Sequence, residues 1–298
     1  MTTGTTEAGT PFPAGAVDAG EFPLTIRDFE RIAAIVHAEA GILLQSNKVN
    51  LVYSRLAKRL RMLKLRSFKE YCALVADPEE HEERGAMIRA LTTNVTRFFR
   101  EPHHFEHLKA NLLPSLRAQA MKGGRVRLWS AGCSSGQEPY SIALTLLSTF
   151  PDACSYDVKI LATDIDESMI ERGQAGIFDR STVADVPPDM RQRWFTPLER
   201  QSGAMQVGEE LRTLVTFKKL NLIGAWPMKT KFDAIFCRNV VIYFDSDTQT
   251  TLWSRIVPLL NSDGALYIGH SERVAGPAEK LLVSDGITTY RPQGWRPN

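Results

Sequence analysis

The chain has 298 residues, of which 43% are hydrophobic, which suffices for one large core or for a domain with a smaller partner. Its net charge of +2 is too close to zero to indicate a nucleic-acid-binding protein. The four cysteines have neither a disulfide-framework nor a metal-ligand spacing, so we expect reduced thiols and a cytoplasmic protein. No apolar segment reaches the roughly 18 residues of a membrane span, which argues against membrane insertion.

The N-terminal part of the sequence predicts a tail followed by a small helical domain. Residues 1–23 are rich in Thr, Gly, Ala and Pro and lack the pattern of a secretory signal, so we expect a disordered tail. Thr25 and Asp28 have the spacing of a helix capping box, and a similar pattern begins at Ser67. Residues 24–90 are therefore predicted to form an all-helical N-terminal domain.

One predicted helix of this domain, which begins at Ser46, carries charges of a single sign. Its apolar residues recur every three or four positions, as in a helix that packs on one side. No acidic residue occurs from Ser46 to Arg66, whereas solvated helix faces usually mix both signs. A merely solvated face and a binding face both remain open. The basic residues of this helix are Lys48, Arg55, Lys58, Arg59 and Arg61.

Residues 126–147 predict a buried strand, a glycine-rich turn and a helix. Gly132 and Gly136 allow main-chain N–H groups and a helix N-terminus to approach a ligand without a Cβ in the way. Their spacing differs from the G-x-G-x-x-G of dinucleotide-binding proteins. Glu138, at the start of the helix, suits a ligand with ammonium or hydroxyl groups. The same pattern also fits a tight connection that serves packing alone.

Polar residues follow two further predicted strands. The apolar run over 158–164 ends at Asp164, and an acid at the end of the second strand of a doubly wound fold binds ribose hydroxyls. The apolar run over 232–237 is followed by Arg238 and Asn239. Because ligands bind outside the carboxyl ends of parallel strands, we predict an α/β fold with these polar groups in one crevice.

Residues 176–213 interrupt the alternation of strands and helices. They contain two consecutive prolines, a short amphipathic helix and a stretch of alternating apolar residues. This segment is long for a connection between a helix and a strand. We therefore expect an inserted subdomain with a small antiparallel sheet.

Five segments of the chain occur together, and in the same order, in one enzyme family. They are residues 92–101, 130–141, 162–166, 237–245 and 269–272. With these segments the sequence resembles the chemotaxis receptor methyltransferases, the CheR family, over roughly residues 24–292. The resemblance implies a Rossmann-like class I methyltransferase domain over residues 91–298, with a mainly parallel sheet. It also implies S-adenosylmethionine as the cofactor and S-adenosylhomocysteine as the product.

The resemblance assigns roles to individual residues. Glu138 and Arg238 would hold the amino-acid end of the cofactor, and Asp164 its ribose. Arg100 and Tyr243 would orient the incoming carboxylate as the catalytic residues. The cofactor-binding residues that the resemblance implies are Asn94, Thr96, Arg100, Glu138, Asp164, Asn221, Leu222, Arg238 and Asn239. Taken by themselves, Asn94 could instead belong to a helix cap and Asn221 to a turn.

The resemblance also implies the acceptor and the partner. A receptor glutamate would accept the methyl group, and the basic helix would bind acidic helices of chemotaxis receptor cytoplasmic domains. The enzyme would be a cytoplasmic monomer. Some family members bind a receptor peptide through a Gly-x-Gly turn in the inserted subdomain. Residues 198–204 lack that turn, so peptide binding stays open.

Methyl transfer to a carboxylate that is ionised at pH 7 needs no general base, which fits the absence of a Ser/His/Asp or Cys/His constellation. His103, His104 and His107 lack the His-Glu-x-x-His spacing, so we expect no metal site. The alternatives are a nicotinamide-dependent oxidoreductase, a class I methyltransferase with a different acceptor, and a catalytically silent receptor-binding adaptor.

Overall fold

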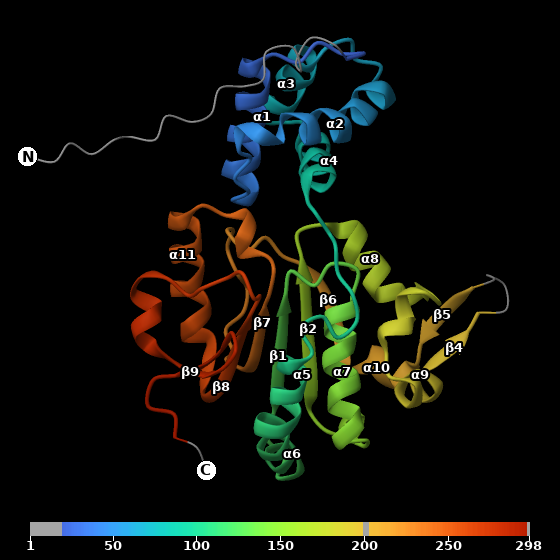
Figure 1. Cartoon of the computed structure of the whole chain (residues 1–298), viewed down its shortest axis with the longest axis vertical. Helices are drawn as coiled ribbons and strands as arrows, with labels where there is room; N and C mark the ends of the chain where they lie inside the picture. Colours follow the sequence, from blue (N-terminus) through green and yellow to red (C-terminus); the bar gives the residue numbers. More distant parts are fainter. Residues whose placement is uncertain (1–19, 199–202, 297–298) are drawn as a thin grey trace, which may run out of the picture. The chain divides into compact units, whose positions relative to one another are not determined.

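The computed structural model describes residues 20–198 and 203–296 of the chain. The chain divides into two compact units, Met1–Thr92 and Thr93–Asn298 (Figure 1). Among the described residues, no helix combines the length and the apolar character that crossing a membrane requires.

The first unit is helical, as the sequence predicts. The side chain of Thr25 accepts a hydrogen bond from the main-chain N–H of Asp28, and Asp28 accepts one from the N–H of Thr25, both at 3.2 Å, which completes the predicted capping box. Of the tail expected over residues 1–23, residues 1–19 lie outside the described residues. The helices are α1 (Ile26–Ala40), η1 (Ser46–Lys48), α2 (Val49–Leu63), α3 (Phe68–Ala76) and α4 (His81–Leu91).

The core of the first unit forms between the apolar sides of these helices. Ile32 of α1, Leu56 of α2 and Phe68 of α3 are fully buried. Helix α1 packs on α3, and α2 packs on α4. The burial of one side of α2 explains its apolar periodicity and leaves its other side for the basic residues.

The second unit is built on a seven-stranded, mainly parallel sheet. The strand order is β6-β2-β1-β7-β8-β10-β9, and β6, β2, β1, β7 and β8 run parallel, whereas β10 is antiparallel to β8 and β9. This arrangement confirms the predicted fold class. The strands are β1 (Val126–Ala131), β2 (Val158–Asp164), β6 (Val215–Lys219), β7 (Phe232–Cys237), β8 (Leu260–Ile268), β9 (Leu282–Gly286) and β10 (Thr289–Pro292).

The centre of the sheet is buried on both faces. In β1, Leu128 pairs with Ile160 of β2 on one side and with Ala234 of β7 on the other. All six residues of β7 are buried. Strands that are covered on both faces read as continuous apolar runs, which is why the sequence marks β1, β2 and β7 clearly.

Helices and short helical turns precede and connect these strands, and α7 packs against β1, β2 and β6. They are α5 (His103–His107), η2 (Leu108–Leu112), α6 (Leu113–Met121), α7 (Gln137–Thr149), η3 (Ala153–Ser155), α8 (Glu167–Ala175), η4 (Thr182–Asp185), α9 (Pro188–Trp194), α10 (Glu209–Leu214), η5 (Val241–Tyr243), α11 (Ser246–Ile256), η6 (Val257–Leu259) and η7 (Gly276–Leu281).

A second, three-stranded sheet lies within the inserted segment. Strands β3 (Ile177–Asp179), β5 (Ala204–Val207) and β4 (Phe195–Pro197) form an antiparallel sheet in the order β3-β5-β4. This sheet is the small antiparallel sheet that the sequence predicts, and it is visible beside α9 in Figure 1. Of the loop that bears on peptide binding, residues 199–202 lie outside the described residues.

Candidate functional site

The carboxyl ends of the parallel strands form one edge of the large sheet. From β1 the chain adds β2 and β6 on one side and then β7 and β8 on the other, so the strand order reverses beside β1. Ligands of doubly wound folds bind at this reversal. Glu138 lies in the first turn of α7 after β1, Asp164 ends β2, and Arg238 follows β7, so the edge unites the three strand ends that the sequence predicts.

The turn after β1 is tightly held. Gly132 and Gly136 have φ angles of 78° and 100°, a region that glycine adopts without strain. A Cβ on Gly132 would lie 2.3 Å from Cγ2 of Val240, so this turn and the chain after β7 approach each other as only glycine permits. The N–H groups of Gly132 and Cys133 both donate to the carbonyl of Thr163 at 2.8 Å. The turn is thereby fixed against β2.

Asp164 is a buried carboxylate at the centre of this edge. It accepts hydrogen bonds from the main-chain N–H groups of Ser134 at 2.7 Å and of Asp166 at 2.9 Å. Burial raises the pKa of Asp164, while these two hydrogen bonds oppose the rise because they favour the charged form. Each oxygen retains a lone pair, so the carboxylate can still accept from hydroxyl groups of a ligand.

The segment before α5 is attached to the same edge. Nδ2 of Asn94 donates to Oδ2 of Asp166 at 3.0 Å, and the hydroxyl of Ser134 donates to the carbonyl of Asn94 at 3.0 Å. Asp166 also caps α8 through the N–H of Ser168. The amide of Asn94 therefore has a partner in the protein, and Thr96 follows it in a partly exposed position.

Arg238 lies between two carboxylates. Its Nη1 donates to Oε2 of Glu138 at 3.1 Å, its Nη2 lies 3.4 Å from Oε2 of Glu101, and Nη2 also donates to the carbonyl of Arg100. The side chain of Arg238 is only 1% exposed. Glu138 accepts a further hydrogen bond from the hydroxyl of Ser130 at 2.7 Å. Two acids and one guanidinium leave one negative charge in excess.

The electrostatics of the two acids differ. Burial raises the pKa of Glu138, and the charge of Arg238 opposes this rise. Burial also acts to raise the pKa of Glu101, but the hydrogen bond from His270 and the charge of Arg238 outweigh it and lower the pKa to about 2. Glu101 is therefore ionised at neutral pH. Glu101 belongs to the segment 92–101, but neither its residue pattern nor the resemblance predicts a role for it.

The two residues expected to orient the acceptor lie on different segments. Arg100 is partly exposed, and its guanidinium donates to the carbonyl of Val95 at 3.1 Å. Tyr243 is partly exposed at the end of η5, after β7. Asn239 precedes η5, and its Nδ2 lies 3.5 Å from Oε1 of Glu101, the residue that follows Arg100.

Asn221 and Leu222 lie just beyond β6. Oδ1 of Asn221 accepts from the N–H of Ile223 at 3.1 Å, which is the hydrogen bond of an Asx turn. The carbonyl of Leu222 accepts from Nε1 of Trp226 and from Nη1 of Arg255. The hydrogen bond of the Asn221 side chain is therefore the one expected of a turn residue. Because Asn221 follows β6, it nevertheless lies at the ligand-binding edge of the sheet.

Strained main chain gathers at this edge. Among the described residues, six non-glycine residues have positive φ, and four of them flank the site. Such conformations persist where the surrounding structure holds them, and they cluster at functional sites. The four are Phe99 (φ 50°), Glu101 (56°), Ser134 (49°) and Asn239 (59°). No pattern in the sequence predicts these angles.

The five basic residues of η1 and α2 differ in their contacts, since the three arginines have partners within the helical unit. Arg55 donates to the carbonyls of Leu91 and Thr92 at 3.0 and 2.7 Å, at the end of α4. Arg59 forms an ion pair with the buried Glu83. Arg61 pairs with Glu21 on the surface. Lys48 and Lys58 are exposed.

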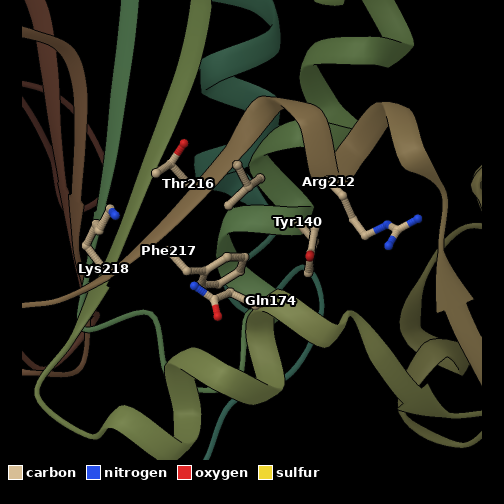
Figure 2. A pocket seen from close by; sticks show the side chains of 7 residues that line it. Tyr140, Gln174, Arg212, Thr216, Phe217 and Lys218 are labelled. Atoms are coloured by element: carbon tan, nitrogen blue, oxygen red, sulfur yellow. The ribbon is translucent and has the colours of Figure 1, made fainter.

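A pocket of about 290 Å³ lies elsewhere, along the edge strand β6 (Figure 2). The hydroxyl of Tyr140 beside it donates to the carbonyl of Gly173 at 2.8 Å, within the packing of α7 on α8. The residues that line it are Tyr140, Gln174, Arg212, Val215, Thr216, Phe217 and Lys218. It contains none of the predicted cofactor-binding residues, so we do not place the cofactor there.

Glu101, His103 and His104 offer one ligand atom each within 4.8 Å of one another. A metal ion there would face the guanidinium of Arg238, 3.4 Å from Oε2 of Glu101. Burial and the charge of Arg238 lower the pKa of His104 to about 3, so this ring is neutral at neutral pH. Arg238 already balances the charge of Glu101, and the cluster is better described as the support of that arginine.

S-adenosylmethionine fits the groups at the edge of the sheet. Its sulfonium and ammonium groups suit the excess negative charge around Glu138, and its ribose hydroxyls suit the carboxylate of Asp164. Gly132 and Gly136 carry no Cβ at their two positions in the turn. Of the residues predicted to bind it, the structure brings Asn94, Glu138, Asp164, Arg238 and Asn239 to this edge.

Comparisons with known proteins agree with this description. A family model described as "CheR methyltransferase, SAM binding domain" matches residues 94–289, and one described as "CheR methyltransferase, all-alpha domain" matches residues 27–92. A probable chemotaxis protein methyltransferase of Rhizobium etli is 53% identical over 258 residues, which cover 86% of this chain and 96% of the relative.

Two further relatives are similar over most of their length. Chemotaxis protein methyltransferase 2 of Pseudomonas aeruginosa is 41% identical over 287 residues, 95% of this chain and 99% of the relative. The chemotaxis protein methyltransferase of Escherichia coli is 40% identical over 265 residues, 88% of this chain and 89% of the relative.

Proposed function

The chain belongs to the CheR methyltransferase family, and on this basis we propose that it methylates glutamate side chains of chemotaxis receptors. It is an S-adenosylmethionine-dependent methyltransferase. The observation that carries the proposal is the convergence of Glu138, Asp164 and Arg238 at the strand-order reversal, within a chain that matches the family over both units. The products would be a glutamyl methyl ester and S-adenosylhomocysteine.

The reaction is an in-line displacement, for which S-adenosylmethionine supplies a methyl group on a positively charged sulfur. The acceptor carboxylate is already ionised at pH 7, so no residue of the protein has to remove a proton. The protein's task is to bring two oppositely charged groups into line and to exclude water. In this proposal Arg100 and Tyr243 orient the acceptor oxygen, Asp164 binds the ribose, and Asn94, Thr96, Asn221, Leu222 and Asn239 line the cofactor.

The contacts of Arg238 refine its proposed role. Its hydrogen-bonding and ion-pair partners all belong to the protein: Glu138, Glu101 and the carbonyl of Arg100. We therefore assign to Arg238 the placement of Glu138 and of the segment that carries Arg100. Glu138 would then receive the ammonium group of the cofactor.

For recognition, we propose that residues 24–90 form the domain that binds the receptor and residues 91–298 the catalytic domain. The partner in this proposal is an acidic helix of a receptor's cytoplasmic part, and the enzyme acts as a cytoplasmic monomer. Charge complementarity supports this choice, because η1 and α2 carry Lys48, Lys58 and Arg61 in exposed positions. Arg55 and Arg59 contribute through the fold, since each contacts other residues of the helical unit.

The decisive experiment is transfer of a labelled methyl group from S-adenosylmethionine to receptor-containing membranes. We expect label in the receptor that base releases as methanol, because carboxyl methyl esters are hydrolysed by base. Receptor in which the acceptor glutamates are replaced by alanine is the control and should take up no label. Base-stable label would indicate a different acceptor, and cofactor binding without any transfer would indicate an adaptor.

A further inference from the structure

Glu272 is a buried acid that the mechanism above does not use. It follows β8 in a turn that is closed by a hydrogen bond from its own N–H to the carbonyl of Gly269 at 2.9 Å. The residue is 4% exposed. The sequence places it in the segment 269–272, for which the resemblance implies no role.

The carboxylate of Glu272 accepts four main-chain hydrogen bonds. Oε1 accepts from the N–H groups of Val240 at 2.8 Å and Val241 at 2.9 Å, and Oε2 from those of Asn239 at 2.8 Å and Gly269 at 2.6 Å. Three consecutive amides therefore point at one side chain. An ionised carboxylate has only acceptor sites, about four of them, so it matches these donors without a leftover group.

The main chain that Glu272 holds does not rest in an ordinary conformation. Asn239 has a φ of 59°, and the helical turn η5 begins two residues later. A non-glycine residue keeps such an angle when its surroundings hold it. The hydrogen bond to Glu272 fixes the main chain of Asn239 on one side, and the packing of Val240 on Gly132 fixes this segment on the other.

The fit around Glu272 also depends on a glycine. A Cβ on Gly269 would lie 2.6 Å from Nδ2 of Asn239 and 2.8 Å from Oε2 of Glu272. Both distances are too short for non-bonded atoms, so the end of β8 approaches the chain after β7 as closely as glycine permits. The segments that follow β7 and β8 are therefore closely packed against each other at the ligand-binding edge.

We propose that Glu272 is a positioning residue for methyl transfer. By fixing the amides of residues 239–241, it sets the position of Arg238 on one side and of Tyr243 on the other. This inference rests on the proposed function, since it takes Tyr243 as a group that orients the acceptor. Glu272 touches neither the cofactor nor the acceptor in this role.

The chain offers a matched control for a purely structural acid. Asp233 is 5% exposed and lies at the opposite end of β7. It accepts from the N–H of Arg127 at 2.8 Å and from Nδ2 of Asn261 at 2.7 Å. Asp233→Asn therefore removes a buried, hydrogen-bonded carboxylate from the same strand without disturbing the site.

The test compares Glu272→Gln with Asp233→Asn. The glutamine has one acceptor oxygen in place of two, and its amide N–H groups oppose main-chain donors. We expect kcat for receptor methylation to fall by about ten- to a hundredfold, as small misplacements of reacting groups do. The Kd for S-adenosylmethionine should rise by a smaller factor than kcat falls, because Glu272 holds Asn239 and Arg238 but leaves Asp164 in place. The KM for receptor should stay within about threefold. Asp233→Asn should keep kcat within about twofold.

Amide hydrogen exchange tests the hold on residues 239–241 independently of enzyme activity. Glu272→Gln should speed exchange at residues 239–241, and Asp233→Asn should not. If Glu272→Gln does not fold, Glu272→Asp serves instead, because it keeps both oxygens but withdraws them by one methylene. Glu272→Asp should also lower kcat and the protection of these amides from exchange, but by smaller factors than Glu272→Gln.

Equal kcat values in the glutamine and control variants, or unchanged exchange at residues 239–241, would overturn the inference. A loss confined to KM or Kd would overturn it as well. A wild-type protein that transfers no methyl group would refute the proposed function itself, whereas an active wild type with an active Glu272→Gln refutes the positioning role alone.

Discussion

Nη1 of Arg238 lies 3.1 Å from Oε2 of Glu138, and this contact links the end of β7 to the first turn of α7. The link spans the place where the strand order reverses, with Glu101 on the other side of the guanidinium. Removing the cation from such a buried pair leaves two carboxylates without a counter-charge, which is far more costly than losing an exposed pair.

We therefore expect Arg238→Met to lower the free energy of unfolding of the second unit by about 3–5 kcal/mol. Urea titration followed by tryptophan fluorescence measures this, because all five tryptophans lie between residues 129 and 295. Lys219→Met, which breaks the exposed pair with Glu167, is the control and should cost less than about 1 kcal/mol. Similar losses in both variants would contradict the importance of the Arg238 cluster.

Asp164→Asn should weaken the binding of S-adenosylmethionine. A hydrogen bond to a charged group contributes about 1.5–3 kcal/mol, so the Kd should rise by about ten- to a hundredfold. Isothermal titration calorimetry measures the change. Asp157→Asn removes an acid just before the opposite end of β2 and should leave the Kd unchanged. An unaltered Kd in Asp164→Asn would exclude the ribose role.

Tyr243→Phe separates a catalytic from a packing role, because it removes only the hydroxyl. If Tyr243 orients the acceptor, kcat should fall by about ten- to a hundredfold, while the Kd for S-adenosylmethionine changes little. Single-turnover methylation of receptor at saturating cofactor is the measurement. Equal losses in kcat and affinity, or none in either, would make Tyr243 a packing residue.

The fold was predictable because the central strands are covered on both faces. The apolar runs of these strands, and Asp164 and Arg238 at their ends, can be identified from the sequence alone. Parallel pairing then places the strand ends together. The small antiparallel sheet was predictable from the break in alternation over residues 176–213. Both predictions rest on patterns that are local in the sequence.

What could not be predicted depends on contacts between distant residues. The contact of Arg238 with Glu138 joins residues 100 positions apart, and the φ of 56° at Glu101 is imposed by its neighbours. Glu272 belongs to a short segment with no visible pattern, yet its partners are Asn239, Val240 and Val241. On α2, charge alone could not distinguish Arg55, which contacts the end of α4, from the exposed Lys58.

The titration of His104 should lower the stability of the second unit as the pH is lowered from 7 to 5. Burial and the charge of Arg238 lower the pKa of His104 to about 3 in the folded protein, whereas the unfolded chain binds the proton near pH 6.5. Protons therefore favour the unfolded state between these values, and His104 alone should account for about 2 kcal/mol between pH 7 and 5. Glu101, with its pKa lowered to about 2, adds the same trend below about pH 4.5.

His104→Gln keeps a hydrogen-bonding side chain near Thr288 but does not titrate, so its unfolding free energy should depend less steeply on pH. Urea titrations at pH 7, 6 and 5, followed by tryptophan fluorescence, compare the two slopes. Parallel slopes for the wild type and the variant would show that His104 binds its proton equally in both states.

The basic helix α2 should select the receptor through its exposed charges. Reversing Lys48 and Lys58 to glutamate should lower the rate of receptor methylation by about tenfold at low salt, because two attractions become repulsions. The salt dependence of the rate should flatten, since the remaining steering is weaker. Binding of S-adenosylmethionine and far-UV circular dichroism should be unchanged.

Two variants separate recognition from net charge and from folding. Reversing the exposed Lys109 and Lys280 of the second unit makes the same change in net charge and should leave the methylation rate unaltered. Arg55→Gln, in contrast, should destabilise the helical unit by about 1–3 kcal/mol, because the carbonyls of Leu91 and Thr92 lose a charged donor. If the Lys48/Lys58 variant methylates receptor at the wild-type rate in low salt, the face is only solvated and recognition lies elsewhere.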